Sequence, residues 1–217
     1  MCDMEHKTEL TAGDHAVFND IAATGVSESL RLLSKMTGRH WNVFPSKLAL
    51  SDLPDVLKKF SPRETVRFGG DLALKGDMAM SLLYVFPQES MINITHCFTN
   101  ESLLDSNPMS LLEEWAVAEV SNVLANAFLN TVANTLKMKI LPTVPRVIAQ
   151  TRQVLLEKAA ERAKIKAEHV LFCEMRLEVQ NLAMSAAFYL LLDSASLKAL
   201  INKMHRPQKP SADNDFV

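Results

Sequence analysis

A row of amide side chains follows one face of a helix predicted in the second half of the chain. Glu119 begins this row, and four asparagines continue it at helical spacing: Asn122, Asn126, Asn130 and Asn134. An amide can donate and accept hydrogen bonds without changing its protonation state. Asparagine is a mediocre helix former, and a purely solvated face more often carries Glu, Lys or Gln. The residue choice makes this face a candidate functional surface, with a solvated outer face as the alternative.

The opposite face of the same segment is apolar and predicts burial. The helix should open at Asn107 and Pro108, because proline favours the first turn, and continue to about Lys137. With about 100° of rotation per residue, six side chains form one stripe: Val117, Val120, Leu124, Phe128, Val132 and Leu136. We therefore expect an amphipathic helix that turns the row of amides away from the core.

The rest of the chain is predicted to form helices and β-hairpins. A first helix should begin in the cap region of residues 11–14, run to Thr37 and stop at Gly38. Glycine at Gly69 and Gly70 indicates a strand bulge, since no phosphate-loop motif follows. The remaining elements are expected at residues 66–74 and 78–86 (a hairpin), 146–166 (a charged helix), 169–179 and 182–192 (a second hairpin), and in a short helix capped at residues 193–194.

The two halves repeat one order of elements: helix, extended segment, helix, hairpin, helix. Pro45 aligns with Pro145, and a match between the two hairpins pairs Tyr84 with Phe188. One hairpin per half is too small to bury a core alone. We therefore predict an α/β fold with a pseudo-two-fold axis, in which a central, largely antiparallel sheet carries the long helices. The predicted boundaries are a single domain at 1–205, halves at about 14–100 and 107–204, and a flexible tail at 206–217.

Composition argues against several classes of function. The formal net charge is -2 and the basic residues are dispersed, which disfavours nucleic acid as a partner. No apolar run approaches the roughly 20 residues of a membrane span, and the charged start of the chain does not resemble a signal peptide, so we expect a cytoplasmic protein. The three cysteines do not form a disulfide framework, and Cys97 and Cys173 are expected in the core. The six histidines include no pair at metal-ligand spacing, so no metal site is expected.

One motif on the amide row resembles the signature of a known family. Glu119 and Asn122 are one helical turn apart, and 22 residues separate Asn122 from Pro145. This spacing resembles the signature of the CheC/CheX/FliY family, bacterial phosphatases of the phosphorylated chemotaxis response regulator CheY. The segments at 76–90, 122–130 and 139–145 also resemble the family. The resemblance covers roughly residues 14–204 and is closer to CheC, by length and duplication, than to CheX.

The resemblance implies a CheC-like fold and a role for each matched residue. Asn122 would orient water for in-line attack on the aspartyl phosphate, and Glu119 would form a salt bridge that seats the receiver domain. Trp115, Asn126 and Pro145 are the expected partner contacts. Phosphoryl transfer gains mainly from positioning and charge stabilisation, which suits an amide and a carboxylate. The magnesium ion would belong to the phosphorylated partner, and the chain would need no cofactor of its own.

Two departures from the family pattern leave alternatives open. Trp115 stands where the family often has Asp or Ser, and it could contact the partner or belong to the core. In the first half, Asn19 and Ala22 occupy the positions of Glu119 and Asn122, so we expect a single active site. The alternative function is a non-catalytic module that sequesters a receiver or binds a CheD-like partner. A purely structural role in the flagellar switch has less support.

Overall fold

One antiparallel sheet organises the structure, a computed structural model that describes residues 11–46, 48–61, 64–99, 111–180 and 182–205. Within these ranges the sheet has eight strands in the order β1-β7-β8-β4-β3-β5, and β2 and β6 complete its edges beside β7 and β3. The strands are β1 (Trp41–Pro45), β2 (Ala49–Asp52), β3 (Arg67–Gly76), β4 (Met80–Pro87), β5 (Ile140–Pro142), β6 (Arg146–Gln150), β7 (His169–Val179) and β8 (Leu182–Leu192).

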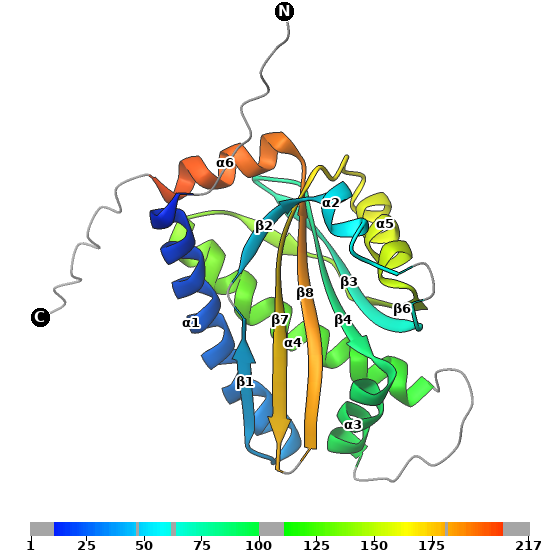
Figure 1. The fold of residues 1–217 in the computed structure, drawn as a ribbon. Coiled ribbons are helices and arrows are strands. Elements are labelled where there is room, and N and C mark those ends of the chain that lie inside the picture. The colour runs from blue at the N-terminus through cyan, green and yellow to red at the C-terminus, as the bar shows by residue number, and fades with distance from the viewer. Residues whose placement is uncertain (1–10, 47, 62–63, 100–110, 181, 206–217) are drawn as a thin grey trace, which may run out of the picture.

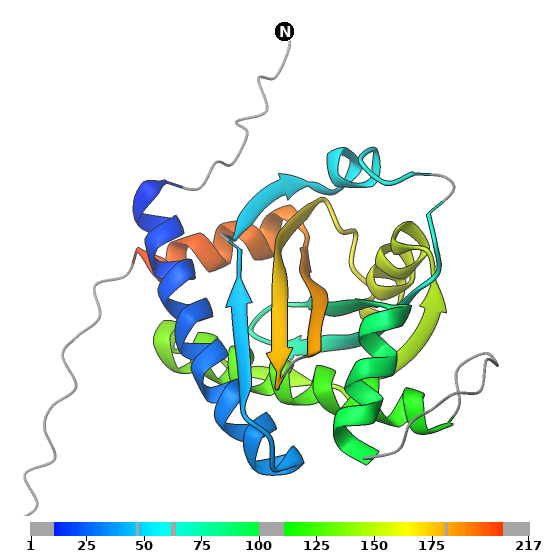
Figure 2. The same ribbon diagram turned by 60° about the horizontal axis from the view of Figure 1, so that its bottom comes forward.

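Helices cover both faces of this sheet, as Figures 1 and 2 show. The long helices α1 (Ala12–Thr37) and α4 (Leu111–Leu136) contact each other on one face, where α3 (Gln88–Thr99) and α6 (Ser194–Met204) complete the main core. The short α2 (Leu53–Leu57) and α5 (Arg152–Ala163) cover a smaller core on the other face. Across the described ranges, every helix is too short or too polar to cross a membrane.

The ends of α1 and α6 follow the predicted caps. Thr11 and Asp14 form a capping box, in which each side chain accepts a hydrogen bond from the other residue's backbone N–H. Gly38 ends α1 in the left-handed conformation, with a φ of 66° that glycine adopts at little cost. The Asp193 side chain caps α6 by accepting from Ser196 N. The predicted start of α4 at Asn107 and Pro108 lies outside the described residues, as does the predicted tail at 206–217.

The halves are joined by an exchange of edge strands. β1 and β2 of the first half pair with β7 of the second, and β5 and β6 of the second half pair with β3 of the first. At the centre, β4 pairs with β8, and Tyr84 lies opposite Phe188. These are the same two residues that the sequence repeat aligned, and their pairing agrees with the predicted relation between the halves. Each half therefore supplies the edge strands that flank the hairpin of the other half.

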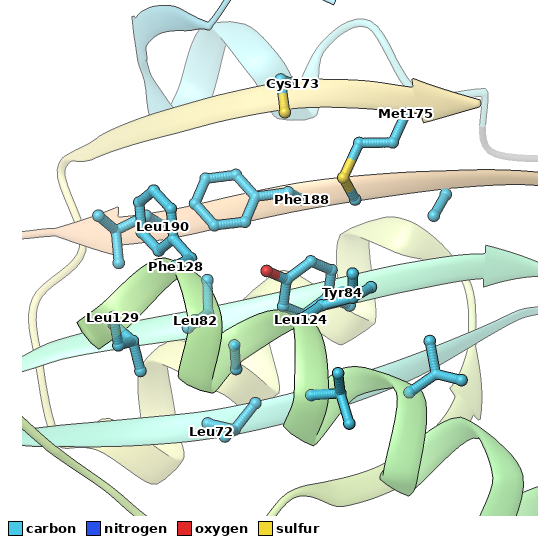
Figure 3. Packing of buried hydrophobic residues seen from close by; sticks show 14 of the residues in the cluster. Leu72, Leu82, Tyr84, Leu124, Phe128, Leu129, Cys173, Met175, Phe188 and Leu190 are labelled. Carbon is cyan, nitrogen blue, oxygen red and sulfur yellow. The ribbon is translucent and has the colours of Figure 1, made fainter. Parts of the chain in front are cut away.

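Aromatic side chains fill the core beneath this central pair (Figure 3). The ring centroids of Tyr84 and Phe188 are 5.6 Å apart, and Phe128 of α4 contacts Phe188 at 4.9 Å, both in edge-to-face geometry. Burial raises the pKa of the nearby Cys173 thiol to about 12. Cys173 and Cys97 are both buried and free, which confirms them as core thiols.

Two glycines in β3 admit close packing rather than a bulge, so the predicted bulge is wrong. Gly70 pairs regularly with Tyr84 on one side and with Val147 on the other. A Cβ atom at Gly70 would lie 2.1 Å from Ser121 Oγ of α4, and one at Gly69 would lie 2.8 Å from Leu155 Cδ2 of α5. Glycine is needed because a helix lies directly on the strand from each side.

The charged helix predicted at residues 146–166 is shorter than expected. Residues Arg146–Gln150 form strand β6, which pairs with β3, and the helix begins only at Arg152. Pairing with the open edge of β3 satisfies the backbone of this segment and buries Val147 and Ile148 partly on opposite faces. Tertiary pairing therefore overrides the local helical pattern here.

Asp14 ties the start of α1 to the end of α6. Its carboxylate accepts from Thr11 N at 2.8 Å and lies 2.7 Å from His205 Nε2. Burial by itself raises the pKa of Asp14, but hydrogen bonds with Thr11 and His205 outweigh burial and leave the pKa below its ordinary value. A carboxyl whose pKa is lowered by folding stabilises the fold above its unfolded pKa, and that stabilisation is lost as pH falls through the folded pKa.

Replacing Asp14 should therefore reduce stability in a pH-dependent way. We expect Asp14→Asn to lower the free energy of unfolding by about 1 kcal/mol near neutral pH, through the lost capping and ion-pair contacts. The difference from the wild type should shrink as the pH is lowered from about 6 to about 2. Urea unfolding at several pH values measures this. Asp20→Asn changes an exposed carboxylate of the same helix and should unfold like the wild type; an Asp14→Asn deficit that does not depend on pH would contradict the assignment.

The packing of α4 on β3 gives a second prediction. Gly70→Ala should lower the free energy of unfolding by about 1–3 kcal/mol, because the added methyl group overlaps Ser121. Gly13→Ala is the matched control: its Cβ would meet only Thr11 Oγ1, at 3.6 Å, and alanine favours the helix. Urea denaturation of both variants measures the effect. Equal stability of the two variants would argue against close packing at Gly70.

Candidate functional site

The row of amides lies on the outward face of α4, as the sequence predicted. The six residues of the apolar stripe are all buried. Glu119, Asn122 and Asn126 are half-buried, and Asn130 and Asn134 are exposed. The helix is buried over a wider arc than its stripe, because α1 and α3 flank it while β3 lies beneath. The narrow remaining face holds the motif.

Asn126 fixes the orientation of the Asn122 amide. Asn126 Nδ2 donates to Asn122 Oδ1 at 2.9 Å, across one helical turn. This bond occupies one lone pair of Asn122 Oδ1 and leaves the other lone pair and the Nδ2 hydrogens for a ligand. The Asn122 side chain forms no other hydrogen bond within the described part of the chain. An oriented amide therefore faces outward at the centre of the row.

Glu119 presents an unpaired carboxylate beside this amide. Glu119 is half-buried, and its carboxylate forms no hydrogen bond or ion pair with any other residue that the structure describes. Glu119 and Asn122 share one surface, because residues three apart on a helix are neighbours. A free carboxylate in this place can pair with a cationic side chain of a partner.

Trp115 extends the same face with an exposed aromatic ring, which favours a partner contact over the alternative of a core residue. Its exposed fraction is 49%, and its ring meets Phe98 of α3 edge-on at 5.6 Å. Trp115 lies one turn before Glu119 on α4. The contact with Phe98 holds one edge of the indole and leaves the rest for a partner. Exposed, well-supported aromatic rings are typical of protein interfaces.

Pro145 lies in the loop between β5 and β6 and is half-buried. The structure links this loop to the motif through Gly70, which packs under Ser121, the neighbour of Asn122, and pairs with Val147, two residues after Pro145. Motif and loop therefore approach the same part of β3 from two directions. No hydrogen bond between described residues joins Pro145 to Glu119 or Asn122.

A buried ion network holds this loop, and the sequence analysis missed it. Asp71 of β3 is only 2% exposed and is paired with Arg162 of α5 and with Arg146, whose Nη2 lies 3.1 Å from Asp71 Oδ2. Arg162 Nη2 also donates to Val144 O at 2.9 Å. Thr143 N donates to Ala73 O at 3.0 Å. The available signal was an aspartate inside an otherwise apolar strand, since such a charge requires a partner.

The first-half copy of the site lacks these features. Asn19 is exposed and Ala22 half-buried on α1, in place of Glu119 and Asn122. Val26 and Leu30 pack against the main core, and Leu33 is fully buried. The apolar face of α1 is therefore used in folding. Among the described residues, no group of three His, Cys, Asp or Glu side chains could hold a metal ion.

Comparison with known proteins shows where this fold occurs. No protein-family model matches the sequence, and no curated protein sequence matches it either. Solved structures do match. Thermotoga maritima FliY is 14% identical with a TM-score of 0.70, over 91% of this chain and 98% of that chain. FliM in its complex with SpeE from H. pylori is 8% identical with a TM-score of 0.68, over 90% and 96% of the two chains.

A putative chemotaxis protein from Desulfovibrio vulgaris Hildenborough is also similar. It is 15% identical with a TM-score of 0.50, over 79% of this chain and 96% of that chain. FliY is one of the three proteins that give the resembling family its name. The CheC-like fold expected from the sequence is therefore the fold that the chain adopts.

The two tryptophans offer a direct check on the placement of Trp115. Trp41 is 1% exposed, and its Nε1 donates to Thr37 Oγ1 at 2.8 Å, whereas Trp115 is half exposed. We expect Trp115→Phe to shift the fluorescence emission to shorter wavelength and to remove most of the quenching by acrylamide. A variant whose emission wavelength and quenching by acrylamide equal those of the wild type would contradict the exposed placement of Trp115.

Proposed function

We propose that the outer face of α4 accelerates hydrolysis of the aspartyl phosphate on a CheY-like receiver domain. The observation that carries this proposal is the Asn122 amide, which Asn126 orients outward beside the unpaired Glu119 carboxylate. Hydrolysis of an acyl phosphate needs a water molecule aligned with the phosphorus atom and the leaving oxygen. A fixed amide that can donate and accept is suited to holding that water.

Each residue of the face has one task in this proposal. Asn122 enters the partner's site and orients the attacking water, and Asn126 keeps the amide from rotating. Glu119 pairs with a cationic side chain of the receiver and sets the register of docking. Trp115 supplies apolar contact at one end of the face, and Pro145 borders it from the neighbouring loop. A magnesium ion, where the reaction uses one, is held by the receiver and neutralises charge on its phosphoryl group.

Fold similarity supports this proposal without identifying the substrate. The chain shares its fold with FliY, and the Glu119, Asn122 and Pro145 spacing resembles the family signature on matching positions. The receiver domain and its phosphate are inferred from that signature together with the geometry of Asn122. The structure contributes the outward orientation of the amide, the free carboxylate and the supported aromatic ring.

The alternative proposal is a non-catalytic module that binds a receiver or a CheD-like partner. FliM, which has a similar fold, was solved in a complex with another protein, SpeE. The exposed ring of Trp115, where the family often has a small or acidic residue, also favours a docking role. In this alternative the same face binds its partner tightly and leaves the phosphate intact.

A phosphate-release assay separates the two functions. The wild-type chain should accelerate dephosphorylation of its cognate receiver, and Asn122→Ala should reduce that acceleration roughly 10²-fold, since positioning effects reach this size. Asn126→Ala should cause a smaller loss, because it frees the Asn122 amide to rotate. Glu119→Ala should weaken receiver binding more than turnover, with a reduced dependence on salt.

Matched controls are available in the same chain. Asn130→Ala removes an exposed amide two turns further along α4, and Asn19→Ala removes an exposed amide of α1 at the position equivalent to Glu119. Both should retain wild-type activity. Full activity of Asn122→Ala would reject the catalytic assignment. Tight receiver binding by the wild type with no faster phosphate release would reject catalysis altogether and support the binding module.

A further inference from the structure

A hollow lies on the sheet face opposite α4. Its volume is about 480 Å³, and small side chains of the central strands lie within its lining, among them Val85, Ser185 and Ala187. Val85 and Ala187 belong to the smaller core that α5 covers, whereas Ser185 is exposed. In Figure 1 no helix stands in front of the lower halves of β7 and β8. The hollow forms where α2 and α5 leave the sheet uncovered, and its size suits a small-molecule site.

Three arginines from separate elements converge on this hollow. Arg67 comes from β3, Arg152 from the start of α5 and Arg176 from β7, while Glu174 is the one acidic side chain among the described residues of the lining. Behind the lining, Glu64 is 6% exposed and is paired with Arg152. The described lining therefore holds three guanidinium groups, and the carboxylates of Glu64 and Glu178 behind it hold Arg152 and Arg176 in place. Guanidinium groups match the planar geometry of carboxylate and phosphate.

The guanidinium group of Arg152 is held in place before any ligand arrives. It pairs with Glu64 and lies 4.4 Å from the ring centre of Phe60. These contacts lower the entropy that Arg152 would lose on binding a ligand. Arg152 therefore presents a guanidinium group of fixed position to the hollow.

Arg67 and Arg176 retain unused capacity for hydrogen bonding. Arg67 Nε is buried, has no hydrogen-bond partner among the described residues, and lies 3.7 Å from Glu64. Arg176 is paired with Glu178, and its guanidinium lies 6.0 Å from the ring centre of Phe44. Phe44 is 53% exposed at the rim. A buried donor without a partner is costly, so a ligand that orders Arg67 would recover that cost.

We propose that this hollow binds a small molecule carrying a phosphate or carboxylate group. Arg67, Arg152 and Arg176 contact the anionic group, and Phe44 covers an apolar part of the ligand. The convergence of three guanidinium groups on one hollow, rather than along an extended strip, favours a compact ligand over an acidic protein segment. The site lies across the sheet from Asn122, so it is independent of the proposed function on α4.

Calorimetric titration of the full chain tests this site. Inorganic phosphate and citrate are the probes, because they separate phosphate from carboxylate recognition. We expect at least one to bind at millimolar concentrations, and Arg176→Gln and Arg67→Gln each to weaken that binding roughly tenfold, the equivalent of about 1.4 kcal/mol. Arg67→Lys retains charge but lacks the fork of donors, so it should restore binding only in part.

Arg31→Gln is the matched control, because Arg31 is also exposed and ion-paired, with Glu28 on α1. It should leave binding unchanged. The proposal is overturned if neither phosphate nor citrate gives a heat of binding. It is also overturned if Arg31→Gln weakens binding as much as Arg176→Gln does, because that result indicates unspecific electrostatic attraction. Tighter binding of a glutamate-rich peptide than of either probe would also overturn it and indicate a protein ligand. Should Arg67→Gln fail to fold, the more exposed Arg176→Gln still decides the outcome.

Discussion

The close approach of α4 to β3 at Gly70 determines how the candidate site is presented. Because Gly70 has no side chain, Ser121 can turn inward and rest on the strand. Asn122, the next residue, is then rotated by about 100° toward solvent. A second glycine, Gly25 of α1, lets the backbone of α4 approach at Phe128. A Cβ atom at Gly25 would lie 3.0 Å from the Cα atom of Phe128. Two missing side chains thus fix the depth and the rotation of the helix that carries the motif.

The site is assembled from both halves of the chain. α4 belongs to the second half, but the strand beneath it, β3, belongs to the first, and the Pro145 loop is held through Asp71 of that same strand. A buried carboxylate with two arginine partners is costly to disturb, because removing one partner leaves an uncompensated charge. A strand of the first half, β3, therefore lies under the candidate functional face of α4, which belongs to the second half.

The sequence predicted the features that arise from local pattern. The 3.6-residue period located α4 and its buried stripe, a Thr–Asp cap and a glycine located the ends of α1, and the repeat paired Tyr84 with Phe188. Features that depend on distant partners were not predictable in this way. Strand β6 forms because the edge of β3 is open to it, and Trp115 remains half exposed while its ring contacts Phe98 of the neighbouring helix α3. The arginine-lined hollow joins β3, α5 and β7, which no single window of sequence contains.

The exchanged edge strands also bear on how the chain folds as it is synthesised. β1 and β2, at residues 41–52, pair only with β7, which begins at His169. More than a hundred residues must therefore follow β2 before these strands find their sheet. Pairings so distant along the chain slow folding and leave strand edges open meanwhile. β1 and β2 stay unpaired until β7 has been synthesised, so completion of the sheet is a late event of translation.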